Sequence, residues 1–185
     1  VTCVSSAAGW QPTADLSALG ASAPHIAMDD QGNGLAVWGQ LDSATTTTNS
    51  LWASRYEAAT GRWSAPVLLE NLAGSAGYAV GEAHLAMHRA TGRAVFTWLH
   101  TVNGTVNVWA RDFDPATGWG TATNLESVDG MTGTPSAGLD GSGNAMVVWA
   151  QMTPRWSIWA SRFARGTGWG TPQLLETHDT VGGLD

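Results

Sequence analysis

Two histidines occupy matching places in similar phrases of the sequence. His25 opens "HIAMD" and His84 opens "HLAMH", while Ser136 is the counterpart in a third phrase. Two imidazoles that face one channel could share a metal ion or an anion. Because the third position holds serine and no carboxylate or cysteine completes a ligand set, we predict no metal site and no cofactor. His25 and His84 remain candidates for side chains that face a central channel.

The second group of candidate site residues is aromatic. Trp156 follows Arg155 in the loop sequence "MTPRWS", and Tyr78 lies in the insertion "AGSAGYAVGEA". An exposed indole beside a guanidinium can stack on a sugar ring or against a protein partner. We therefore predict Trp156, Arg155 and Tyr78 as ligand-binding candidates. The alternative for Trp156 is that it only covers a loop.

Catalytic motifs are absent from the sequence, which contains no G-x-S-x-G, H-E-x-x-H, phosphate loop or G-x-G-x-x-G. The acidic residues are too scattered to nominate the carboxylate pair of a glycosidase. Asp29, Asp30 and Asp140 lie in glycine-containing turns, where an aspartate bonds to its own backbone. We therefore predict no catalytic residue and a protein that is not an enzyme.

Composition excludes several classes of partner. The 185 residues carry a formal net charge of -7, and the basic side chains are all arginines that form no stripe, so we predict no nucleic-acid binding. No apolar run approaches the roughly 18–20 residues of a membrane-spanning helix, so we predict no membrane span. The one cysteine, Cys3, cannot form an internal disulfide.

The elements that must position these residues are repeated along the chain. Ten of the eleven tryptophans align in three columns, at intervals of roughly 50–60 residues. The columns are Trp38, Trp98 and Trp149; Trp52, Trp109 and Trp159; and Trp10, Trp63, Trp119 and Trp169. The sequences that flank these tryptophans are also similar, as in "GNGLAVWGQ" and "GNAMVVWAQ". Because a residue that recurs in every repeat most simply serves packing, we assign these ten tryptophans to the structural core.

Each repeat is predicted to contain four strands. Runs such as "LAVW" and "LWASRY", rich in β-branched and aromatic residues, are separated by glycine turns such as "DDQGNG". Four antiparallel strands per roughly 50 residues, repeated, are typical of β-propeller blades, which bury their faces against each other. We predict an all-β chain that forms a partial ring of three complete blades and an N-terminal remnant. The predicted parts are an incomplete blade at 1–20, blades at 21–71, 72–127 and 128–177, and a C-terminal tail or linker at 178–185.

These motifs resemble a known kind of repeat. The pattern G-N-[GA]-x-x-V-W, [LIV]-W-A-[SR]-x-[YF] and T-G-W-G is similar to tandem repeats of secreted or surface-anchored bacterial β-propeller proteins, and it covers nearly the whole chain. The D-x-x-G-N turn also resembles the Asp-box of sialidase-like propellers, but His88 and Arg93 replace Asp29 and Asn33 in the middle repeat. The resemblance implies a propeller fold and an extracellular or cell-surface location, and it carries no activity.

The blade count leaves open faces and unpaired strand edges, since propellers close with roughly four to eight blades. Either the chain is part of a longer propeller, or copies associate into a ring or a head-to-tail filament. We expect a non-catalytic extracellular or cell-surface module that binds glycan or protein, or assembles with itself. The alternative is a scaffold fragment of a secreted, glycosidase-like propeller hydrolase.

Overall fold

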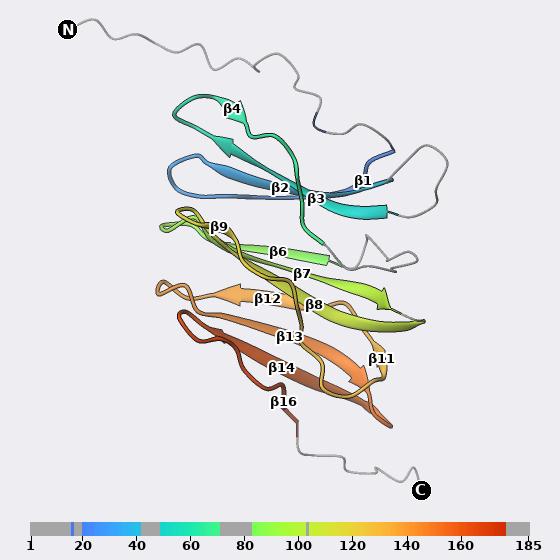
Figure 1. Ribbon diagram of the computed structural model, residues 1–185. Coiled ribbons are helices and arrows are strands. Elements are labelled where there is room, and N and C mark those ends of the chain that lie inside the picture. The colour runs from blue at the N-terminus through green and yellow to red at the C-terminus, as the bar shows by residue number, and fades with distance from the viewer. Residues whose placement is uncertain (1–15, 17–19, 42–48, 71–82, 103, 177–185) are drawn as a thin grey trace, which may run out of the picture.

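The computed structural model describes residues 16, 20–41, 49–70, 83–102 and 104–176 (Figure 1). The regular structure of these residues consists of sixteen strands and no helix. Every strand pairs antiparallel with its neighbours, and the strands form three sheets, named A, B and C in chain order. The prediction of an all-β chain is confirmed.

In each sheet the long strands are neighbours in chain order, and the last edge is made of two short strands that pair with the same long strand. In sheet C the first edge is likewise made of two short strands. Sheet A contains β1 (Ser22–Met28), β2 (Gly34–Leu41), β3 (Asn49–Glu57), β4 (Arg62–Trp63) and β5 (Val67–Leu68). Sheet B contains β6 (Ala83–His88), β7 (Arg93–Val102), β8 (Thr105–Asp114), β9 (Gly118–Trp119) and β10 (Thr123–Asn124). Sheet C contains β11 (Met131–Thr132), β12 (Ser136–Leu139), β13 (Ala145–Met152), β14 (Trp156–Ala164), β15 (Gly168–Trp169) and β16 (Gln173–Leu174).

The last edge of each sheet is interrupted at the same place. In sheet A, Trp63 pairs with Tyr56 but Val67 pairs with Ala53, so the register shifts by one residue, as in a β-bulge. Sheets B and C contain the same shift. In sheet A the interval includes Pro66, which has no N–H to donate to the ladder. The fourth strand of each repeat is therefore two short strands rather than one.

The sheets stack face to face in the order A, B, C (Figure 1). Strands β1 and β6 contact each other across the first boundary, and β6 and β12 contact each other across the second. Sheet B is therefore covered on both faces, whereas sheets A and C each have one face that no described sheet covers.

The burial of the central strands follows from this stacking. On β7, Phe96 and Trp98 belong to the apolar cluster between sheets A and B, while Val95 and Leu99 belong to the cluster between sheets B and C. Successive side chains of a strand point to opposite faces, so β7 is buried on both. On β13, buried residues alternate with exposed or partly exposed ones, because only the face toward sheet B is covered by another sheet.

The tryptophan columns lie on one face of each sheet. In sheet B, Trp98, Trp109 and Trp119 face sheet A. In sheet C, Trp149, Trp159 and Trp169 face sheet B. In sheet A, Trp38 lies opposite Trp52 on the outer face, since neighbouring Val37 faces sheet B. Trp10 lies outside the described residues. Burying one such indole stabilises the fold by several kcal/mol, on the order of 200 Å² at about 25 cal/mol per Å².

Candidate functional site

The two histidines lie at successive sheet boundaries. The imidazole of His25 on β1 meets the Phe96 ring of sheet B edge-on, with 6.1 Å between ring centres. His84 Nδ1 on β6 accepts a hydrogen bond of 2.9 Å from the backbone N–H of Ala137 in sheet C. Each imidazole ring therefore contacts the next sheet of the stack, sheet B for His25 and sheet C for His84. Among the described residues, no three His, Cys, Asp or Glu side chains come together in a way that could hold a metal ion.

The aspartate turns have the same hydrogen bonds in sheets A and C. Asp29 Oδ1 accepts hydrogen bonds from the backbone N–H of Gln31 and Asn33, and Asp29 Oδ2 accepts one from Asn33 Nδ2. Asp140 makes the equivalent three bonds with Ser142 and Asn144. The carboxylate oxygens thus bond within their own turn, as expected for aspartate in a glycine turn.

In sheet B, an ion pair stands in place of the hydrogen bonds of the asparagine. In sheet A, Asn33 Oδ1 accepts a hydrogen bond of 3.0 Å from the backbone N–H of Ala58, which ties the β1–β2 turn to the β3–β4 turn. In sheet B, Arg93 stands at the position of Asn33, and its Nη2 lies 2.9 Å from Asp114 Oδ2. The arginine therefore makes the equivalent connection between turns through side chains.

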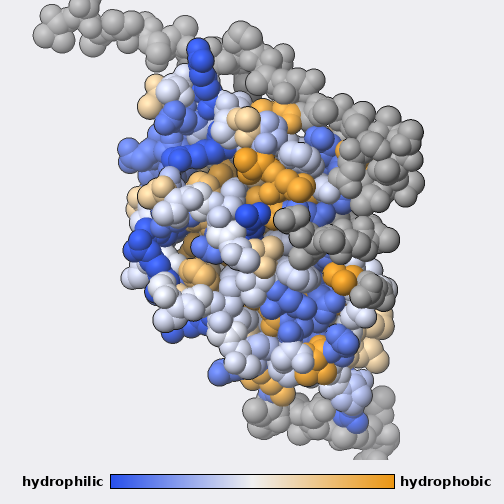
Figure 2. Space-filling view, viewed as in Figure 1, coloured by the Kyte–Doolittle hydropathy of each residue, from blue (hydrophilic) through white to orange (hydrophobic). Residues whose placement is uncertain are grey.

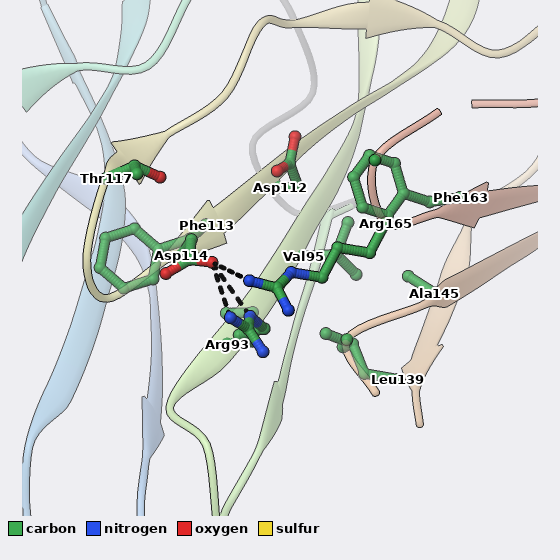
Figure 3. Close-up of a pocket in the computed structure, with 13 residues that line it drawn as sticks. Arg93, Val95, Asp112, Phe113, Asp114, Thr117, Leu139, Ala145, Phe163 and Arg165 are labelled. Atoms are coloured by element: carbon green, nitrogen blue, oxygen red, sulfur yellow. Dashed lines mark hydrogen bonds and ion pairs between the residues drawn. The ribbon is translucent and has the colours of Figure 1, made fainter. Parts of the chain in front are cut away.

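A cavity of about 160 Å³ lies between sheets B and C beside this ion pair. Figure 3 shows Arg93 and Arg165 converging on Asp114, while Asp112 lies apart from them on the cavity wall. The second contact, from Arg165 Nη2 to Asp114 Oδ2, measures 3.7 Å. The Phe163 ring forms part of the apolar wall.

The two carboxyl groups of the cavity differ in their electrostatics. Hydrogen bonding from the Ala116 N–H, followed by the bond from Arg93, lowers the pKa of Asp114. Burial raises the pKa of Asp112, since desolvation penalises its charged form. With both arginines directed at Asp114, the cavity offers one carboxyl group and a volume below the roughly 300–1,000 Å³ of small-molecule sites.

The repeat explains why this cavity exists. At the boundary of sheets A and B, the Arg55 guanidinium lies 5.9 Å from the centre of the Phe113 ring, and its Nη1 donates to the Pro115 carbonyl at 3.2 Å. At the boundary of sheets B and C, Asp112 takes the position of Arg55, and Phe163 that of Phe113. The shorter aspartate leaves room that the arginine occupies at the first boundary.

A second hollow lies along the edge of sheet A. It encloses about 470 Å³ and is lined by Arg55, Glu57, Thr60, Arg62, Trp63 and Ser64. One indole lies among the charged and hydroxyl side chains of this lining.

Polar pairs cross both sheet boundaries at another repeated position. Glu70, after β5, lies with Oε2 3.0 Å from His100 Nδ1 of sheet B, and both side chains are buried. Glu126, after β10, accepts a hydrogen bond of 3.3 Å from Gln151 Nε2 of sheet C. Glu176 is the third member of this glutamate column, and it is exposed at the outer side of sheet C.

The outer face of sheet C exposes residues whose repeat counterparts are buried. It carries Met146, Met152, Trp156 and Ile158 on β13 and β14, with Leu175 beyond β16, and all five are exposed. Leu69, the counterpart of Leu175 in sheet A, is 0% exposed, whereas Leu175 is 55% exposed. Figure 2 shows apolar side chains that reach the surface at the sheet C end of the stack. This face, named the C face, is an apolar surface without a described neighbour.

The outer face of sheet A is exposed only in part, since Trp38 on this face is 6% exposed. The A face, the outer face of sheet A, carries Ile26 and Met28 of β1 with Trp38, Trp52 and Tyr56. Ile26 is 59% exposed, whereas its counterpart Leu85 in sheet B is 8% exposed because sheet A covers it. Both ends of the stack therefore expose apolar side chains that the same fold buries at internal positions.

The structure places two of the three aromatic-site candidates at the C face. Trp156 begins β14 opposite Met152, so it belongs to that face, and the exposed Arg155 precedes it in the turn after β13. Tyr78 and Cys3 lie outside the described residues. Met146, Ile158 and Leu175 were not singled out in the sequence, although the repeat columns that contain them were visible there.

Comparison of the chain with protein-family models and with curated proteins gives no match. In the part of the chain that the structure describes, no helix has the length and apolar character to cross a membrane.

Proposed function

We propose that sheets A, B and C are blades of a β-propeller and form a partial ring. The repeated strand order, the face-to-face stacking and the contacts between β1, β6 and β12 support this assignment. In a propeller the first strand of each blade is innermost, so adjacent first strands are expected to meet.

We further propose that the protein is a non-catalytic interaction or structural module that acts outside the bacterial cell or on its surface. The observation that carries this proposal is the C face, where Leu175 is exposed although its repeat counterparts Leu69 and Leu125 are buried. An apolar face of this kind is a place for another molecule: copies of the chain, the rest of a longer propeller, a protein or a glycan. Trp156 and Arg155 at one margin provide stacking and charge for such a contact.

The proposal is tested by two measurements on the purified chain. Light scattering gives the native mass, and a panel of immobilised neutral and acidic oligosaccharides reports glycan binding. We expect either a particle heavier than the 19.3 kDa chain or retention on a glycan, in each case weakened by Trp156→Ala. Leu174→Ala, which changes an exposed side chain off the C face, is the matched control.

Two results would argue against this function. A monomer that binds no glycan would leave the C face without a role. Hydrolysis of chromogenic glycosides by the same preparation would favour the alternative, in which the blades are the scaffold of a secreted hydrolase.

A further inference from the structure

We propose that the cavity between sheets B and C binds a guanidinium group, held between the carboxylate of Asp112 and the ring of Phe163. The group would belong to a small free guanidine or to an arginine side chain of a peptide. This inference goes beyond the proposed function, because the cavity lies between two sheets and is separate from the C face.

The chain already contains such a contact at its first sheet boundary. Arg55 of β3 reaches from sheet A to sheet B, where its guanidinium carbon lies 5.9 Å from the centre of the Phe113 ring. Its Nη1 donates a hydrogen bond of 3.2 Å to the carbonyl oxygen of Pro115. A ring and a carbonyl acceptor thus hold one guanidinium group between two sheets.

The same ring is present at the second boundary. Phe163 occupies the repeat position of Phe113, and each phenylalanine pairs with the tryptophan of the short strand that follows it. The ring centres are 5.4 Å apart at 56° for Phe163 and Trp169, and 5.1 Å apart at 59° for Phe113 and Trp119. The ring that receives the guanidinium is therefore held in the same way in sheet C.

The carbonyl acceptor also has a counterpart. Pro115 comes two residues after Phe113, and Arg165 comes two residues after Phe163, in the turn that follows the long strand. We therefore expect the Arg165 carbonyl at the place of the Pro115 acceptor.

Sheet B lacks the side chain that would fill this place. Asp112 of β8 stands at the repeat position of Arg55, and its side chain is shorter and of opposite charge. The space between the sheets is the cavity of about 160 Å³, and Asp112 and Phe163 both line it. The cavity is thus the place of an arginine head group, with a carboxylate where the arginine side chain would begin.

The charges of the cavity favour a cation at Asp112. Arg93 Nη2 lies 2.9 Å and Arg165 Nη2 3.7 Å from Asp114 Oδ2, so both arginines of the lining face the same carboxylate (Figure 3). Arg111 donates to backbone carbonyls, and among the described residues no basic side chain forms an ion pair with Asp112. Burial raises the pKa of Asp112, and a cation against its carboxylate would offset that cost.

The size and the opening of the cavity suit this group. A volume of about 160 Å³ is close to the roughly 150 Å³ that holds one benzene molecule in a protein interior, and a guanidinium with a short alkyl stem is of comparable size. Thr117, Arg165 and Gly166 of the lining are exposed, and they lie in the β8–β9 and β14–β15 turns. The cavity is therefore reached from the turn end of the two sheets.

The test is a titration of the isotopically labelled full chain, followed by NMR at constant ionic strength. The probes are the propylguanidinium ion and propylurea, its neutral isostere, and the peptide acetyl-Gly-Arg-Gly-amide. We expect the backbone N–H signals of Asp112, Phe163 and Gly166 to shift saturably with propylguanidinium and not with propylurea. Tighter binding of the peptide would identify an arginine side chain as the ligand, and equal binding would mean that the guanidinium group alone is recognised.

Two variants separate the parts of the site. Asp112→Asn keeps the size of the side chain and removes its charge, so binding should weaken about tenfold or more. Phe163→Leu keeps the charge and removes the ring, so binding should weaken by about two- to fivefold. Glu176→Gln, which removes the charge of an exposed side chain, is the matched control and should bind as the wild type does. Circular dichroism checks that each variant is folded.

Three results would overturn this site. The first is a response to propylurea equal to that to propylguanidinium, and the second is unchanged affinity in Asp112→Asn. The third is saturation of the same signals by inorganic phosphate but not by propylguanidinium, which would make Arg93 and Arg165 an anion site. None of these readouts is the native mass or glycan binding, so the guanidinium site and the proposed function can fail separately.

Discussion

The Glu70 carboxylate of sheet A lies 3.0 Å from His100 Nδ1 of sheet B, and both side chains are buried at the boundary between the sheets. Glutamine occupies the histidine position in the other two repeats, as Gln40 and Gln151. The repeat therefore places a glutamate on one sheet and a polar side chain, histidine or glutamine, on the next.

Replacing His100 by leucine should destabilise the protein by about 1–3 kcal/mol, because the buried Glu70 carboxylate would lose its partner. His100→Gln should recover most of this loss, since Gln151 donates to Glu126 from the same column. Urea unfolding of the three proteins measures the difference. Equal destabilisation by leucine and glutamine would show that the polar contact contributes nothing beyond packing.

Trp98 should be the most costly of the tryptophans to remove. It is fully buried between sheets A and B and stacks on Phe96, with ring centres 5.4 Å apart at an interplanar angle of 17°. Trp98→Ala should cost about 3–5 kcal/mol, since the cavity cannot collapse between two sheets. Leu174→Ala, at an exposed edge, should change the free energy of unfolding by less than about 0.5 kcal/mol. A loss below 1 kcal/mol in Trp98→Ala, on the order of an exposed-site change, would contradict the packing role.

The tryptophan columns and glycine turns were sufficient to predict an all-β chain and the approximate places of its strands. The blade count predicted open faces, but the repeat pattern did not identify the residues that the ends expose. Leu69, Leu125 and Leu175 are the same residue at the same repeat position, yet the first two are buried and the third is exposed. The cause is the presence or absence of a neighbouring sheet, which a local sequence pattern does not contain. The interrupted fourth strand was also missed, because "GWGTATNLE" reads as continuous.

The surroundings of the candidate site residues were likewise not predictable from the sequence pattern. The columns placed His25 and His84 at equivalent positions of β1 and β6, but the partners of the rings, Phe96 and Ala137, are fixed by inter-sheet distances. Likewise, Trp156 was recognised as an aromatic outside the columns, while its membership of an exposed apolar face depends on the register of β13 and β14.

Asn33 should stabilise two turns at once. Its Nδ2 donates to Asp29 Oδ2 at 2.9 Å, and its Oδ1 accepts from the Ala58 N–H at 3.0 Å. Asn33→Ala removes both bonds and should cost about 1–3 kcal/mol, at roughly 0.5–1.5 kcal/mol for each. Gln31→Ala, in the same turn, keeps the backbone N–H that Asp29 accepts and should be close to neutral. Thermal unfolding of both variants makes the comparison, and equal midpoints would mean that the side chain of Asn33 is dispensable.

Glu126 should make the stability of the protein depend on pH in the neutral range. Burial raises the pKa of its carboxyl group from 4.5 to about 7; the Val108 N–H, which donates to Oε1, opposes this shift, and the charge of Asp129 adds to it. The folded protein therefore binds a proton more tightly at this site than the unfolded chain does. Stability from this source is present below about pH 4.5 and declines as the pH rises through about 7.

Glu126→Gln cannot ionise, so its unfolding midpoint in urea should vary less than that of the wild type between about pH 5 and about pH 8. Glu57→Gln is the control, because Glu57 is exposed and its replacement should leave the slope unchanged. Midpoints are compared at matched ionic strength, since Asp129 acts on Glu126 through its charge. If the wild type and Glu126→Gln have parallel pH profiles, the carboxyl group is ionised in the folded protein throughout this range, and the Glu126–Gln151 contact at the second sheet boundary is a charged one.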